Sequence, residues 1–216
     1  QDGVQNPLIT RFYHNKLFFY GRHFATSYFQ HFDGDFLFVK NGLPIRYKVP
    51  WSGNIFPLEI PFLLFGFAVL LTEGIKARRY IYLIPLAWVA IGAIPAGLTW
   101  EDIPNIQRSS LMLYGLVMVS AFGLNETLNL LQNKKIRFIF GSIVAVIFLQ
   151  QILYFTHMYF YHSRIQEPWH RSAAVKELVF LTENLSKEYK KVIMTTDGNN
   201  NFIHHLFYTK FEPKTF

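Results

Sequence analysis

Residues 80–99 read YIYLIPLAWVAIGAIPAGLT, a stretch of twenty residues without a charged side chain. About 20 mostly apolar residues in a helix cross the ~30 Å hydrocarbon core of a bilayer. A core helix of a soluble protein is usually shorter and carries a polar stripe. The stretch therefore predicts a transmembrane helix, and three others of the same character cover residues 55–72, 111–131 and 138–156.

The composition supports the same class of protein. Of the 216 residues, 51% are hydrophobic and 16% charged, against a charged share of about 25% in globular proteins. The 23 Phe and 12 Tyr suit segments at a membrane interface, and the absence of Cys excludes disulfide and thiolate chemistry. We predict a mainly α, multi-span helical membrane protein with about four transmembrane helices.

The net charge of +7 does not predict nucleic-acid binding, because the basic residues are scattered along the chain. Anionic headgroups or a phosphate-bearing lipid are the expected partners. The loops on either side of the middle two spans are basic, with Lys76, Arg78 and Arg79 in one and Lys134, Lys135 and Arg137 in the other. Short loops rich in Lys and Arg stay in the cytoplasm. We therefore predict a multi-pass cell-membrane protein with both terminal segments outside the cytoplasm.

The two ends of the chain are more polar than the middle. Residues 1–54 are expected to form an external loop region with short surface helices, and residues 157–216 an external soluble segment. In the second, a helical pattern after Pro168 precedes an apolar run at 190–197 that reads as a strand. This order predicts the start of a small α/β domain. Because the chain opens in mid-sequence with QDGVQNPLITRF, we expect a fragment of a longer membrane protein.

Several short patterns allow alternative interpretations. Asp33-Gly34-Asp35 has the D-x-D form with which some transferases bind a metal diphosphate, although an Asp-Gly turn is the favoured interpretation. His157, His162 and His170 lack the spacing of a zinc helix, so no metal site is predicted. For Glu126, near Lys134 and Lys135, an ion pair at the membrane edge is favoured over a functional role. Glu59, near the outer end of the first span, is left open.

A set of polar residues falls on the predicted external side. Arg pairs bidentately with phosphate, and carboxylates accept hydrogen bonds from sugar hydroxyls. Each residue alone is better explained as a solvated loop charge, but together they predict a site for a phosphate-bearing lipid with a polar headgroup. Its candidate substrate-binding residues are His31, Asp33, Asp35, Arg46, Glu101, Asp102 and Arg108.

The segment YFQHFDGDFLFVKNGLPIRYKVPWSGNIFPLEIPFLLFGFAVLL (residues 28–71) resembles an external loop and span of GT-C class membrane glycosyltransferases. These are relatives of the dolichyl-phosphate-mannose protein mannosyltransferases and of the aminoarabinose transferase. Residues 96–124, AGLTWEDIPNIQRSSLMLYGLVMVSAFGL, are similar to the family pattern LT-x4-P-(H/N)-x2-R before a span. Residues 197–213 are similar to a stretch of the family's soluble tail. Tyr47 stands where the family often has His.

The resemblance implies transfer of a sugar from a polyprenyl-phosphate carrier to a protein, lipid or glycan acceptor on the external face. It implies a catalytic Asp upstream of this chain, so no catalytic residue is assigned here, and no cofactor is identified. Two other functions stay open: a transporter or flippase for a lipid-linked glycan, and a non-catalytic membrane subunit.

Overall fold

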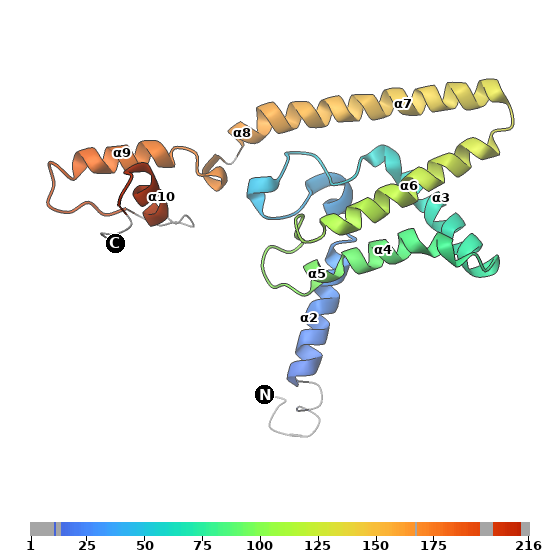
Figure 1. Cartoon of the computed structure of the whole chain (residues 1–216), viewed down its shortest axis with the longest axis horizontal. Coiled ribbons are helices and arrows are strands. Elements are labelled where there is room, and N and C mark those ends of the chain that lie inside the picture. Colours follow the sequence, from blue (N-terminus) through green and yellow to red (C-terminus); the bar gives the residue numbers. More distant parts are fainter. Residues whose placement is uncertain (1–10, 12–13, 167, 195–200, 213–216) are drawn as a thin grey trace, which may run out of the picture. The chain divides into compact units, whose positions relative to one another are not determined.

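The computed structural model describes residues 11, 14–166, 168–194 and 201–212. The chain forms two compact units, Gln1–Ser163 and Arg164–Phe216, and the regular elements among the described residues are helices (Figure 1). Four of them are long and apolar enough to cross a membrane: Pro57–Lys76, Tyr80–Gly97, Ser110–Leu130 and Lys134–Ile165. This confirms the mainly α, four-span class predicted from the sequence.

In the described part of the first unit, helix α2 (Lys16–Gln30) precedes the spans. It leads into a π-helical turn (Asp35–Lys40) and a 3₁₀ turn (Ile45–Tyr47). Helix α3 (Ile60–Leu71) forms the core of the first span. The second span is divided into α4 (Ile84–Gly92) and α5 (Ile94–Gly97), and the last two are α6 (Ser110–Leu130) and α7 (Lys134–His157).

Glycine residues allow α3 and α4 to pack closely on α6. A Cβ atom added to Gly123 of α6 would lie 1.9 Å from the Phe62 carbonyl oxygen of α3, and one on Gly66 would lie 2.1 Å from that of Val119. Nearer the start of α6, a Cβ on Gly92 of α4 would meet the backbone of Met112 at 2.6 Å. Small residues let membrane helices approach until their backbones touch, so α6 is the centre of this packing.

The second span is broken at Ala93, between α4 and α5. Pro95 has no N–H to donate to the Ile91 carbonyl four residues earlier, and the Ala93 N–H caps that carbonyl instead. The Tyr28 hydroxyl of α2 donates to the neighbouring Ala90 carbonyl at 2.9 Å. The break in the span thereby becomes an attachment point for α2.

Helix α7 makes few contacts with the other spans. In the most apolar window of its span no residue is buried, as suits a helix that faces lipid. The helix begins at Lys134, ahead of the predicted residue 138, because the Asn133 side chain accepts from the Lys135 N–H and caps it. Its ring contacts with the rest of the first unit include those of Phe148 and Phe155 with Phe56 and of Phe140 with Phe62 of α3.

The second unit is helical where it is described, and the predicted α/β domain is not supported. It contains a 3₁₀ turn (Pro168–Arg171) and helices α9 (Val175–Leu185) and α10 (Asn201–Tyr208), which pack together. Residues 190–194 of the predicted strand form no strand, and residues 195–197 lie outside the described part. A strand needs a partner for its backbone hydrogen bonds. Here Val192 and Met194 lie against α9 instead, with Thr182 donating to the Met194 sulfur.

Candidate functional site

Two polar segments that are distant in the sequence are joined in the structure. The Leu43 N–H donates to the Pro104 carbonyl at 2.8 Å, and the Ile106 N–H donates to the Leu43 carbonyl at 2.9 Å. Leu43 and Asn105 form a parallel bridge. The loop after α2 (residues 31–56) and the loop before α6 (residues 98–109) therefore form one layer, here called the loop joint.

His31 lies at the centre of the loop joint. Its side chain is fully buried, its Nδ1 lies 2.7 Å from the Ser27 carbonyl, and its Nε2 accepts from the Asn105 N–H at 2.9 Å. This assigns the ring proton to Nδ1, which donates to Ser27. Both ring nitrogens are thus used within the protein. The structure places His31 as a support of the loop joint and not as a contact for substrate.

Burial lowers the pKa of His31 below its usual value, so the folded protein favours the neutral ring. A group of this kind contributes full stability above its unfolded pKa of about 6.5, and the contribution is lost as pH falls through the folded pKa. We expect the melting temperature of the detergent-solubilised protein to fall between about pH 7.5 and about pH 5.5. At neutral pH, His31→Gln should have a lower melting temperature, because its free energy of unfolding is reduced by about 1–3 kcal/mol. The melting temperature of this variant should also change less with pH than that of the original chain.

The matched control for this measurement is His14→Gln, because His14 is exposed. This variant should keep the pH dependence of the original chain. An equal pH dependence in His31→Gln and the original chain would show that His31 does not support the loop joint in the way described.

Asp33 and Asp35 form a turn stabilised by local contacts. The Asp33 carboxylate accepts from the Asp35 N–H at 3.4 Å, and the Asp35 carboxylate pairs with Lys40 at 2.5 Å. Both side chains are exposed. The described part of the chain contains no group of three His, Asp or Glu side chains that could hold a metal ion. The geometry is that of an Asp-Gly turn with two accessible carboxylates.

Arg46 and Arg108 lie in the two segments of the loop joint. Each lies three residues beyond a bridging residue, Leu43 or Asn105, and the two segments run parallel there. The Arg108 backbone N–H donates to the Asn105 side chain at 2.9 Å, and its guanidinium donates to the Glu101 carbonyl at 3.2 Å. The Arg46 guanidinium lies 5.0 Å from the centre of the Tyr47 ring. Two guanidinium groups thus border the loop joint, together with the exposed carboxylates of Glu101 and Asp102.

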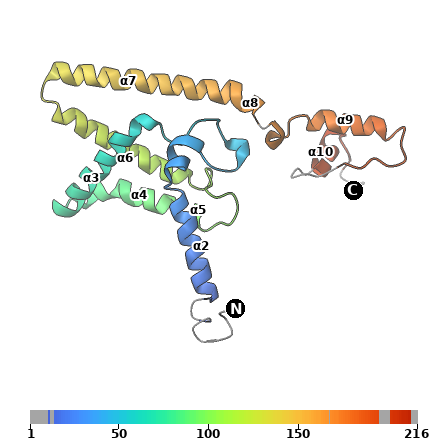
Figure 2. The same ribbon diagram turned by 180° about the vertical axis from the view of Figure 1, so that it is seen from behind.

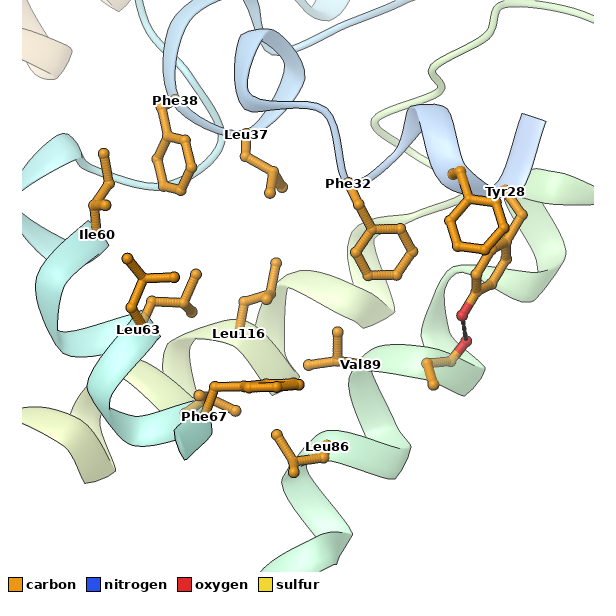
Figure 3. Close-up of a pocket in the computed structure, with 14 residues that line it drawn as sticks. Tyr28, Phe32, Leu37, Phe38, Ile60, Leu63, Phe67, Leu86, Val89 and Leu116 are labelled. Atoms are coloured by element: carbon orange, nitrogen blue, oxygen red, sulfur yellow. Dashed lines mark hydrogen bonds between the residues drawn. The ribbon is translucent and has the colours of Figure 1, made fainter. Parts of the chain in front are cut away.

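An apolar groove of about 600 Å³ lies between the loop joint and the spans (Figure 3). Figure 3 shows Phe32, Leu37 and Phe38 facing Leu63, Phe67 and Leu116 across it. Its one polar side chain is that of Tyr28, whose hydroxyl is bonded to Ala90. The lining residues are Tyr28, Phe29, Phe32, Leu37, Phe38, Ile60, Leu63, Leu64, Phe67, Leu86, Val89, Ala90, Leu116 and Val119.

The groove was not predicted from the sequence. The available signal was the apolar run Phe36-Leu37-Phe38 inside an otherwise polar loop, which indicates a segment that packs against the spans. The position of α2 beside α4 had no comparable signal, because it depends on the break at Ala93.

The remaining candidates contact other groups of the protein. The Glu59 carboxylate accepts from the Phe56 N–H at 3.4 Å, at the start of the first span, and is also hydrogen-bonded to the Ser120 side chain of α6. Glu126 contacts Asn125 and Asn129 on its own helix, and the predicted pair with Lys134 or Lys135 is not among the described ion pairs. The His157 and His162 rings lie 5.1 Å apart.

The chain was also compared with known proteins. It matches no family model, no curated protein and no solved structure.

Proposed function

We propose that this chain is part of an integral membrane glycosyltransferase that transfers a sugar from a polyprenyl-phosphate carrier to a protein, lipid or glycan acceptor. The observation that carries the proposal is the apolar groove between the loop joint and the spans. The loop that supplies Phe32, Leu37 and Phe38 to its lining also carries Asp33, Asp35 and Arg46. A polyprenyl-phosphate sugar has the same three parts: an apolar chain, a phosphate and a hydroxyl-rich headgroup.

Each part of the carrier has a corresponding part of the site. The groove takes the first isoprene units of the lipid, because its lining is almost entirely apolar. Arg108 and Arg46 bind the phosphate, for which guanidinium groups provide bidentate donors. Asp33, Asp35, Glu101 and Asp102 accept hydrogen bonds from sugar hydroxyls. The basic loops between the first and second and between the third and fourth spans support an external location for this site.

The proposed reaction is a displacement at the anomeric carbon of the sugar. The acceptor hydroxyl forms a bond to that carbon as its proton passes to a carboxylate base, and the bond to the lipid phosphate oxygen breaks. Arg108 stabilises the negative charge on the departing phosphate. The resemblance to GT-C enzymes implies that the base lies in a preceding part of the protein, outside this chain.

A transporter is less well supported by the site. Transporters bind substrate at broken helices whose ends face the midplane. The break at Ala93 is occupied by protein contacts, since Tyr28 binds the Ala90 carbonyl and Gly92 packs on Met112.

The proposal predicts that Arg108→Gln reduces sugar transfer. Membranes that contain the full-length protein would be supplied with radiolabelled polyprenyl-phosphate sugar and an acceptor extract. Loss of a charged hydrogen bond to phosphate costs about 1.5 kcal/mol at a partly solvated site, which is about a tenfold loss in rate. Lys134→Gln, an exposed change at the start of α7, is the control and should keep full activity. Equal activity of the two variants would remove the phosphate role of Arg108.

A further inference from the structure

We propose that α2 is an interfacial helix that lies in the headgroup layer of the bilayer and binds anionic phospholipids. This inference does not rest on the proposed glycosyl transfer. It comes from the depth at which α2 is attached, from its exposed apolar side chains and from its charge.

The C-terminal end of α2 is attached to the second span. Tyr28 binds the Ala90 carbonyl, which is seven residues before the Gly97 end of the second span and so about 10 Å along it at the helical rise. A Cβ on Gly97 would meet Phe24 and Tyr28 at 3.1 Å, so α2 also packs on α5. In both views α2 runs across the direction of α4 and α6, at the end of the spans where the loop joint lies (Figures 1 and 2).

The first turns of α2 extend beyond the spans and expose large apolar side chains. Leu17 is 84% exposed, and Phe19 and Tyr20 are more than half exposed. Trp100, from the loop before α6, stacks on His23 with ring centres 3.7 Å apart and contacts Phe19 and Tyr20. Aromatic clusters of this kind are typical of the membrane–water interface.

The positive charge of α2 indicates that anionic lipid contacts this surface. Helix α2 contains Lys16 and Arg22 and no acidic residue, whereas the loops that follow carry charges of both signs. A basic helix with exposed aromatic side chains matches an anionic bilayer surface. A bilayer surrounds the spans in any case, so it meets this surface without any further partner.

The first test uses the unmodified chain in vesicles. A phospholipid with a photoactivatable diazirine near its headgroup is mixed into phosphatidylcholine vesicles with or without phosphatidylglycerol. After irradiation, adducts are located by mass spectrometry. We expect adducts within residues 16–30, with a several-fold higher yield when phosphatidylglycerol is present. The increase should disappear when Lys16→Gln and Arg22→Gln are combined. Adducts on α7 without adducts on α2 would overturn the proposal.

The second test distinguishes lipid from water or protein around α2. The chain has no native cysteine, so Leu17→Cys can carry a single fluorescent label, with the exposed Lys187→Cys as the aqueous reference. The label at residue 17 should be quenched by shallow spin-labelled lipids and be several-fold less sensitive to iodide than the reference. Equal iodide sensitivity would place α2 in water. Protection from both quenchers would show that a second copy or another protein covers it, and either result contradicts the proposal.

Discussion

Replacing Gly123 with alanine is expected to disrupt the packing of α3 on α6. The new Cβ would lie 1.9 Å from the Phe62 carbonyl oxygen and 2.7 Å from the Gly66 nitrogen, and both are backbone atoms that cannot rotate away. The two helices must separate, which costs at least about 1–3 kcal/mol and more where backbones touch. In detergent, the variant should melt well below the original chain or lose its monodisperse elution profile.

The matched control is Gly141→Ala on α7. There the new Cβ meets only a Leu128 methyl group at 3.9 Å, an ordinary van der Waals distance. Alanine also favours a helix over glycine by about 1 kcal/mol, so this variant should be as stable as the original chain or more so. Equal melting of Gly123→Ala and Gly141→Ala would contradict the close approach of α3 and α6.

The proposed function predicts that filling the apolar groove abolishes most of the affinity for polyprenyl phosphate. Ala90 lines the groove and is exposed to it, so Ala90→Trp places an indole in the cavity without replacing a buried side chain. If the indole displaces about four methylene groups of the lipid, binding weakens by about 3 kcal/mol, or more than about a hundredfold. Native mass spectrometry of the detergent-solubilised chain with a short-chain polyprenyl phosphate measures this loss.

The control lies on the same helix. Ala87 is also exposed but does not line the groove, so Ala87→Trp adds the same bulk to the surface of α4 that faces elsewhere. It should bind polyprenyl phosphate as the original chain does. If Ala90→Trp binds as tightly as Ala87→Trp, the groove does not hold the lipid chain.

The four spans could be predicted because each is a long apolar stretch with few or no charged side chains. A bilayer requires that backbone groups be satisfied within a helix, and residues 80–99 can meet that requirement in no other regular form except a closed barrel. The span ends were less predictable, since they depend on local caps such as that of Asn133. The strand expected at 190–197 illustrates the opposite case, because a short apolar run forms a strand only when a partner strand is present.

The arrangement of the candidate site could be predicted only in part. The loop charges suggested that residues 31–56 and 98–109 share one side. Their joining depends on the bridge between Leu43 and Asn105 and on the buried ring of His31, whose partners are 4 and 74 residues away. The groove depends on glycine contacts such as Gly66 with Val119. Such contacts involve backbone atoms of distant residues, and a hydrophobic pattern carries no information about them.

The most direct test of the proposed site is to measure, in intact cells, on which side of the membrane the loop joint lies. A single cysteine is introduced at Gln107, in the loop before α6, or at Lys135, at the start of α7; both positions are exposed. A membrane-impermeant thiol reagent should label the cysteine at residue 107 in intact cells and the cysteine at residue 135 only after the cells are permeabilised. Labelling of residue 135 in intact cells, with residue 107 protected until permeabilisation, would place the loop joint and its arginines on the wrong side for an externally presented sugar lipid.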